Sequence, residues 1–158
     1  MTVKLGPTDL LVPSDVIDSL YSETSTQVNI KEINQYPVNH YFVLKSETEI
    51  SKSALARLTK DKKLKKVLFR RDFELSGIKP RDAKQTSFIN SLIESEVLVS
   101  VGLGSAGTGK TTLAIAYALE QHFNNDKKIY LSKPTSLVSN IGNAFGPVPG
   151  DVNDKYAP

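Results

Sequence analysis

The hydrophobic and polar positions along the chain follow two patterns, one typical of strands and one typical of helices. Together the two patterns predict an α/β protein. Short β-branched and aromatic runs at Val28–Ile30 and Tyr41–Leu44 favour strands, and the breakers Asn34, Pro37 and Asn39 stand between them. Farther along, apolar residues recur with the three- and four-residue spacing of amphipathic helices. We therefore expect strands in the first half of the chain and both helices and strands in the second.

The first half predicts a short helical segment followed by a small β-rich module. The segment Pro13-Ser14-Asp15 is typical of a helix start, with Ser14 as its N-cap. Residues Ser53–Leu58 alternate like a half-buried strand, although their alanines and leucines also suit a helix, and Val67–Phe69 is a further strand candidate. We assign residues 1–25 to the helical segment and residues 26–72 to the β-rich module.

The second half predicts a helix, a strand and another helix. A helix is expected over residues 83–94, where five side chains share helical spacing: Gln85, Phe88, Ile89, Leu92 and Ile93. The run Val97–Val101 has the composition of a buried parallel strand, and Leu113–Glu120 predicts the next helix. Ile129–Leu131 predicts a second parallel strand.

The most specific motif lies between the first of these strands and the helix after it. It consists of Gly104, Ser105, Ala106, Gly107, Thr108, Gly109, Lys110, Thr111 and Thr112. This run satisfies the phosphate-binding pattern G-x-x-x-x-G-K-[ST], in which glycines let backbone N–H groups curl around phosphate oxygens at a helix N-terminus. The alternative is a plain glycine-rich turn with a solvated lysine, which the flanking strand and helix patterns disfavour.

Side-chain chemistry suggests a task for three residues around this motif. Lys110 would reach the β- and γ-phosphates of a nucleotide and is the candidate catalytic residue, while the Thr111 hydroxyl would complete the coordination of Mg²⁺. Upstream, the amide of Gln85 can both donate to and accept from the edge of an adenine. A glutamine on a helix surface is the simpler interpretation of that residue taken alone.

Composition narrows the class of protein. A chain of 158 residues with 39% hydrophobic and 23% charged residues is ordinary for a folded globular protein. It contains no cysteine, so a disulfide framework, a thiolate nucleophile and a zinc ribbon are excluded, and the distant His40 and His122 predict no metal cluster. No apolar stretch reaches the roughly 20 residues that span a bilayer, and no signal peptide is recognisable. We therefore expect no membrane partner and a cytoplasmic location.

Positive charge gathers between Arg57 and Lys84, although the net charge of the chain is only +3. Such a stretch can neutralise nucleic-acid phosphates without reading their sequence. A solvated lysine-rich turn has the same composition and is the more common origin of such a run. The charge pattern alone therefore favours the surface turn.

Four segments resemble, in order and spacing, the motifs of the PhoH family of P-loop ATPases. They are Gly77–Gln85, Gly104–Thr112, Ile129–Pro134 and Pro149–Asp151. The family is related to the superfamily-one helicases, so the resemblance implies a helicase-related P-loop NTPase with a parallel sheet over residues 73–158. It also implies ATP rather than GTP, with Gln85 at the adenine, and RNA or single-stranded DNA as the substrate of ATP-driven remodelling.

The resemblance extends to the upstream module and to one further residue. Tyr36–Leu44 and Ser53–Arg57 look like the linker that joins a PIN ribonuclease domain to the ATPase in longer family members, but the carboxylate cluster of a PIN site is not present, so ribonuclease activity is not predicted. Lys133 stands where PhoH-like proteins commonly have the arginine of a Thr-Arg-Pro motif that touches single-stranded nucleic acid. A lysine can neutralise a phosphate without the two-pronged contact, and a simple turn ending at Pro134 is an equal alternative.

One part of a P-loop ATPase is not found in the sequence. No apolar run ending in Asp follows Thr112, although such an acidic motif holds Mg²⁺ and positions the attacking water. We therefore expect a truncated P-loop core whose open sheet edges favour a homo-oligomer or docking on a full-length homologue. Hydrolysis by this chain stays open, and the alternative function is a nucleic-acid-binding or interaction module with an inactive nucleotide site.

Overall fold

The computed structural model describes residues 6–23, 25–27, 31–67 and 77–132. Its elements follow one another as β1 (Thr8–Val12), α1 (Ser14–Glu23), β2 (Ser25–Gln27), a 3-10 helix (Lys31–Gln35), β3 (Tyr41–Ser46), β4 (Ser53–Leu58), β5 (Lys63–Lys66), α2 (Ala83–Ile93) and α3 (Lys110–Asn125). None of the helices among these residues is long and apolar enough to cross a membrane.

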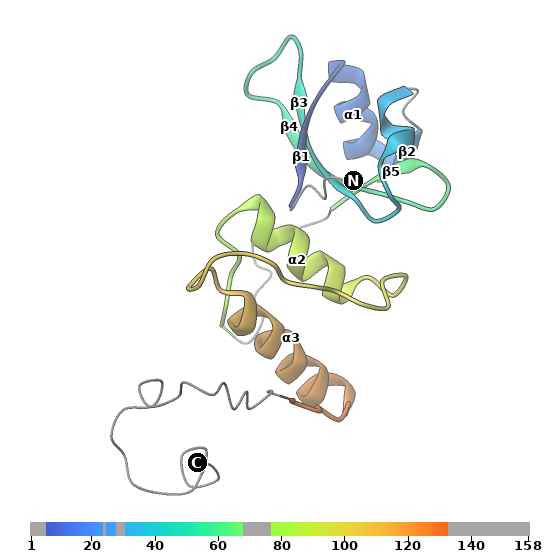
Figure 1. Ribbon diagram of the computed structural model, residues 1–158. Helices are drawn as coiled ribbons and strands as arrows, with labels where there is room; N and C mark the ends of the chain where they lie inside the picture. Colours follow the sequence, from blue (N-terminus) through green and yellow to red (C-terminus); the bar gives the residue numbers. More distant parts are fainter. Residues whose placement is uncertain (1–5, 24, 28–30, 68–76, 133–158) are drawn as a thin grey trace, which may run out of the picture.

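Five strands form one mixed sheet, the N-terminal sheet, in the order β1-β3-β4-β5-β2. β1 runs parallel to β3, with Leu10 opposite Leu44, and the other neighbouring strands are antiparallel. A parallel pair needs a crossover between its strands, and α1 lies within that crossover. Figure 1 shows α1 running alongside the sheet.

One face of the sheet and α1 enclose the main hydrophobic core. Ile17 and Leu20 of α1 are fully buried there, as is Phe42 of β3. The other buried members are Val12, Ile33, Leu44, Ala54, Ala56, Leu58 and Leu64. β1 and α1 therefore share a core with the later strands, whereas the sequence analysis assigned residues 1–25 and 26–72 to separate parts. Those domain boundaries stay predictions.

The opposite face of the sheet contacts α2, and α3 packs against the far side of α2 (Figure 1). Tyr41, Arg57 and Lys65 alternate with the core residues along their strands, so they face away from α1. α2 and α3 share a second, smaller core made of Ile89, Leu113 and Ala116. The helix pair thus lies beside the sheet and has its own apolar contacts.

Most of the predicted helices and strands are confirmed. Tyr41–Leu44 lies in β3, and Ser53–Leu58 is the strand β4 rather than a helix. The helix expected over residues 83–94 is α2, and the helix expected over Leu113–Glu120 is α3, which begins earlier, at Lys110. The strand candidate Val28–Ile30 lies outside the described residues, and so does Val67–Phe69 apart from Val67, which follows β5.

The prediction of two buried parallel strands in the second half is wrong for the described residues. Val97–Val101 and Ile129–Leu131 belong to no strand there, and Leu98, Val99 and Tyr130 are 93%, 79% and 88% exposed. A strand forms only where a neighbour takes its backbone hydrogen bonds, and the described strands all belong to the N-terminal sheet. The α/β class is confirmed, whereas a parallel P-loop sheet is not found among the described residues.

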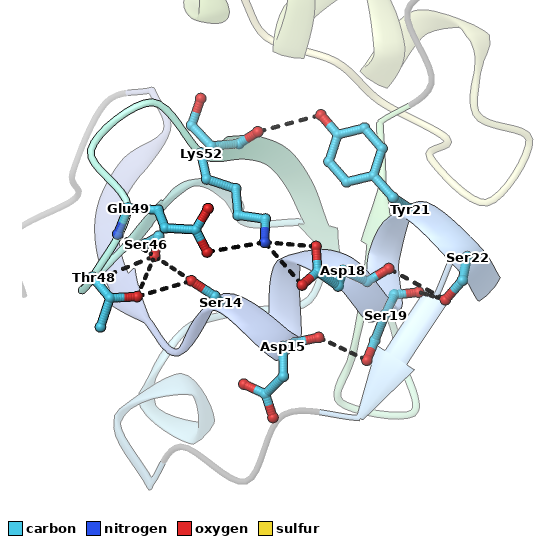
Figure 2. Close-up of polar contacts among 11 residues, drawn as sticks. Ser14, Asp15, Asp18, Ser19, Tyr21, Ser22, Ser46, Thr48, Glu49 and Lys52 are labelled. Carbon is cyan, nitrogen blue, oxygen red and sulfur yellow. Dashed lines mark hydrogen bonds and ion pairs between the residues drawn. The ribbon is translucent and has the colours of Figure 1, made fainter.

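A lysine in the segment between β3 and β4 ties that segment to α1 (Figure 2). Lys52 Nζ lies 2.8 Å from the Asp18 carboxylate of α1 and 3.3 Å from the Glu49 carboxylate. The Ser14 and Ser46 hydroxyl oxygens lie 2.6 Å apart and join the start of α1 to the end of β3. The hydrogen bond to Asp18 raises the pKa of Lys52 above its ordinary value.

Phe42→Ala should lower the free energy of unfolding by about 3–5 kcal/mol, because it removes a fully buried ring and leaves a cavity against α1. Denaturant unfolding followed by circular dichroism measures this change. Ile50→Ala is the control, since Ile50 is fully exposed and its truncation should change the free energy by less than about 0.5 kcal/mol. Equal losses in the two variants would contradict the described core.

Lys52→Met should remove part of the loss of stability at alkaline pH. The pKa of Lys52 is raised in the folded chain, so its contribution is complete below the ordinary value of 10.5 and disappears as the pH rises through the folded value. Thermal unfolding midpoints measured below pH 10.5 and at more alkaline pH give this change in stability. The wild-type midpoint should fall more steeply than that of Lys52→Met, while the exposed-lysine control Lys60→Met should follow the wild type.

Candidate functional site

A side-chain cap fixes the first turn of α2. Asp82 is extended, with φ −147° and ψ 173°, and its carboxylate accepts a hydrogen bond from the Gln85 backbone N–H at 2.8 Å. The Thr86 hydroxyl donates to the Asp82 carbonyl at 2.8 Å. A carboxylate at the N-cap is also favoured by the helix dipole. The cap therefore holds Gln85 at a defined place in the first turn.

The Gln85 side chain connects α2 to the phosphate-binding motif. Its Oε1 accepts from the Arg81 backbone N–H at 2.8 Å, and its Nε2 donates to the Thr108 carbonyl at 3.3 Å. Both ends of the amide thus bind backbone groups, one just before α2 and one just before α3. We call this pair of contacts the Gln85 clasp.

The motif itself forms a tight loop that ends at the start of α3. Gly107 and Gly109 have φ values of 75° and 83°, in the left-handed region that glycine adopts without strain. Gly109 is the N-cap of α3, and its carbonyl accepts from the Leu113 N–H at 2.9 Å. The free N–H groups and positive dipole end of α3 therefore lie directly at the loop.

The ammonium of Lys110 lies inside the loop. Its Nζ donates to the carbonyls of Gly104 at 3.0 Å and Ser105 at 2.6 Å, and to the Thr108 hydroxyl at 3.1 Å. Thr108 Oγ1 also donates to the Ser105 carbonyl at 3.0 Å. An ammonium has three donors, and this loop supplies an acceptor for each. A bound anion at this place would therefore compete with the loop's own oxygens for Lys110.

The loop offers one hydroxyl suited to a magnesium ion. Thr111 lies in the first turn of α3 and is exposed. Mg²⁺ prefers oxygen ligands and usually keeps several waters while bridging phosphates, so this hydroxyl can supply one protein ligand beside a nucleotide. In the described part of the chain, no three His, Cys, Asp or Glu side chains gather into a metal site. The donor chemistry therefore fits Mg²⁺ held mainly by phosphates.

A cavity of about 800 Å³ lies between the loop, α2 and the N-terminal sheet. Its lining includes Gln85 and Lys110, together with Val38, Asn39 and Tyr41 of the sheet region. The sequence analysis missed these three and treated Asn39 only as a strand breaker. The residue type is the available signal, since asparagine enters the left-handed region more readily than most residues, and Asn39 has a φ of 68°.

The other two features predicted to contact nucleic acid are Lys133 and the basic stretch between Arg57 and Lys84. Lys133 lies outside the described residues. Within the basic stretch, Lys65 Nζ lies 3.3 Å from the Glu94 carboxylate, and Lys66 Nζ lies 3.3 Å from the centre of the Tyr21 ring. Part of the basic stretch is therefore engaged in contacts within the chain.

Comparison with known proteins places the chain in a family. Residues 77–158, just over half of the chain, match the model of the family described as PhoH-like protein. The chain is 30% identical over 156 residues to Protein PhoH2 of Bacillus subtilis and to Protein PhoH2 of Mycolicibacterium smegmatis. It is 38% identical over 109 residues to Protein PhoH2 of Thermobispora bispora.

These alignments cover 97%, 97% and 67% of this chain, respectively. The chain spans only 34%, 33% and 24% of the three relatives. No solved structure gives a significant match. The family match includes α2, the phosphate-binding motif and α3, and the chain therefore belongs to the PhoH-like protein family.

Proposed function

We propose that the chain binds ATP together with Mg²⁺ at residues 104–112. The observation that carries this proposal is the place of the Lys110 ammonium, inside the loop and at the N-terminus of α3. A lysine there is suited to the β- and γ-phosphates, and the free N–H groups of the helix favour an anion. Membership of the PhoH-like family supports a P-loop ATPase-like protein.

The remaining roles follow from the chemistry of the loop. Backbone N–H groups of Gly104, Ser105, Ala106, Gly107, Thr108, Gly109 and Thr112 would surround the phosphates, beside the Lys110 ammonium. The Thr111 hydroxyl would hold Mg²⁺, which neutralises charge on the phosphates when bound. Gln85 would contact adenine, since its amide both donates and accepts and lines the same cavity as Lys110. Because the clasp occupies both ends of that amide, adenine would replace at least one backbone partner.

For the whole protein we propose ATP hydrolysis coupled to remodelling of RNA or single-stranded DNA in the cytoplasm, with Lys133 as a phosphate contact. A homo-oligomer or a longer homologue is the proposed protein partner. The exposed apolar side chains of Leu98, Val99, Tyr130 and Leu131 support such a partner, because another chain would remove them from water.

One observation favours an alternative in which the site binds without turnover. After Thr112, the acidic residues in the described part of the chain are Glu120, within α3, and Asp126, at its C-terminal cap. Neither follows an apolar strand, where a residue that positions the attacking water is expected. The alternative is a nucleic-acid-binding or interaction module with an inactive nucleotide site, so binding and hydrolysis have to be measured separately.

Lys110→Ala should weaken binding of a fluorescent ATP analogue with Mg²⁺ by about 10- to 100-fold, because a charge-assisted contact to phosphate is lost. Equilibrium fluorescence titration measures the dissociation constant, and phosphate release is followed in the same samples. Lys127→Ala is the control, since it removes an exposed lysine at the other end of α3.

Binding that depends on Lys110 without phosphate release would support the nucleotide site together with the inactive alternative. Phosphate release that depends on Lys110 would support the ATPase. A folded wild-type chain that does not bind the analogue would overturn the proposed function.

Gly109→Ala should weaken nucleotide binding by about tenfold, because a φ of 83° costs an alanine about 1–2 kcal/mol. The added Cβ would lie 3.5 Å from Gln85 Nε2, an ordinary contact, so backbone strain is the expected cause. The same titration measures the effect. Ala114→Gly weakens α3 by a similar amount without altering the loop, and it should leave the dissociation constant nearly unchanged. Equal losses of affinity in both variants would argue against the loop geometry as the cause.

A further inference from the structure

Six polar side chains form a contact between the N-terminal sheet and α2, which we call the joint. Three come from neighbouring strands, where Tyr41 lies opposite Arg57 and Arg57 lies opposite Lys65. They form a row on the face of the sheet turned away from α1. The other three are Asn90, Glu94 and Glu96, which belong to α2 or follow it directly.

The two halves of the joint are complementary in charge and hydrogen bonding. Arg57 Nη2 lies 3.2 Å from a Glu94 carboxylate oxygen and 3.3 Å from a Glu96 carboxylate oxygen. Lys65 Nζ lies 3.3 Å from the other oxygen of Glu94. The Tyr41 hydroxyl donates to Asn90 Oδ1 at 2.9 Å, and burial raises the pKa of this hydroxyl, so it remains a donor at neutral pH.

Arg57 is the centre of the joint. Only 1% of it is exposed, and a buried charge is tolerated only where it is paired and hydrogen-bonded. Besides the two carboxylates it donates to the side-chain oxygen of Asn39, while its Nε has no partner among the described residues. Its terminal nitrogens therefore hold the sheet and α2 together.

The two glutamates of the joint lie at the C-terminal end of α2, where their charges do not stabilise the helix. Glu94 is the C-cap of α2 and Glu96 follows two residues later, at the negative end of the helix dipole. Negative side chains are unfavourable there, and the last turn of α2 contains no basic residue. The cations of the sheet compensate this charge, so the two glutamates act in docking rather than in capping.

α2 connects the joint to the nucleotide loop. The helix is 11 residues long, and Gln85 in its first turn lies about 14 Å along the axis from Glu94. Gln85 Nε2 lies 3.3 Å from the Thr108 carbonyl of the loop, so a movement of α2 changes the place of the Gln85 amide relative to the loop and to a nucleotide bound there. Tyr41 of the joint and Asn39, which accepts a hydrogen bond from Arg57, also line the cavity that reaches Lys110.

We propose that the joint positions α2 and thereby sets the nucleotide affinity of residues 104–112, with Arg57 as the positioning residue. The sheet holds the C-terminal end of the helix, and the helix presents Gln85 to the loop at its other end. This inference rests on the proposed nucleotide binding and adds to it a dependence on Arg57, Lys65 and the two glutamates, which do not line the cavity.

The test uses the full chain, the fluorescent ATP analogue with Mg²⁺, and variants of the joint. Arg57→Met, Tyr41→Phe and Lys65→Met should each weaken binding, by about 3- to 10-fold for Arg57→Met and less for the other two. Lys45→Met is the matched control for Lys65→Met. Both lysines lie on this sheet in an ion pair and are 52% and 46% exposed, but Lys45 pairs with Asp9 of β1 rather than with α2. The control should bind like the wild type.

A double-mutant cycle separates positioning from a general loss of stability. If Arg57 acts through Gln85, adding Arg57→Met to Gln85→Ala should weaken binding no further, and Arg57→Lys should recover part of the affinity that Arg57→Met loses. Thermal unfolding shows which variants are folded at the temperature of the titration. If Arg57→Met is unfolded, Lys65→Met decides the outcome, because Lys65, unlike Tyr41, does not line the cavity.

Wild-type affinity in folded Arg57→Met would overturn the inference while leaving the proposed function intact. If Arg57→Met is unfolded, wild-type affinity in folded Lys65→Met would do the same. Fully additive effects with Gln85→Ala would also overturn it, because the joint would then act by another route. A wild-type chain without affinity for the analogue would overturn the proposed function and this inference together.

Discussion

The burial of one guanidinium determines how the two parts of the structure meet. Arg57 lies on the central strand of the sheet and is almost fully removed from water, so carboxylates must stand opposite it. Glu94 and Glu96 meet that requirement only when α2 lies across the outer face of the sheet. The buried apolar contacts of α2 are with α3, in the second core, rather than with the sheet. The orientation of the helix pair on the sheet thus depends on a charge that cannot be left unpaired.

Oxygens of the loop at residues 104–112 already accept hydrogen bonds from side chains of the same protein. Lys110 binds three oxygens of the loop, and the Gln85 clasp joins the same loop to α2. Each contact satisfies a polar group that would otherwise face solvent, and each uses an atom that a nucleotide would also use. The proposed binding of a nucleotide would therefore exchange one set of hydrogen bonds for another, and its net gain would come from the charge of the phosphates at the helix terminus.

Features set by local chemistry could be predicted from the sequence, and features set by distant partners could not. The start of α2 depends on Asp82 and Gln85, which are near neighbours in sequence. The loop depends on the glycines and the lysine of one short run. Val97–Val101 has the composition of a buried strand, but pairing is decided by neighbours far away in sequence, and among the described residues it has none. The joint was missed for the same reason, since nothing near Arg57 in the sequence reveals that Glu94 faces it.

The parallel pairing of β1 with β3 also governs the order in which the chain can assemble. β1 and α1 precede β3 in the chain, so they are synthesised before Phe42 and Leu44, which cover them in the core. Until β3 emerges, Ile17 and Leu20 of α1 have no sheet to pack against, and a helix of 10 residues is marginal in water without such packing. The apolar side chains of β1 and α1 therefore stay uncovered until β3, a strand made later, is available to pack against them.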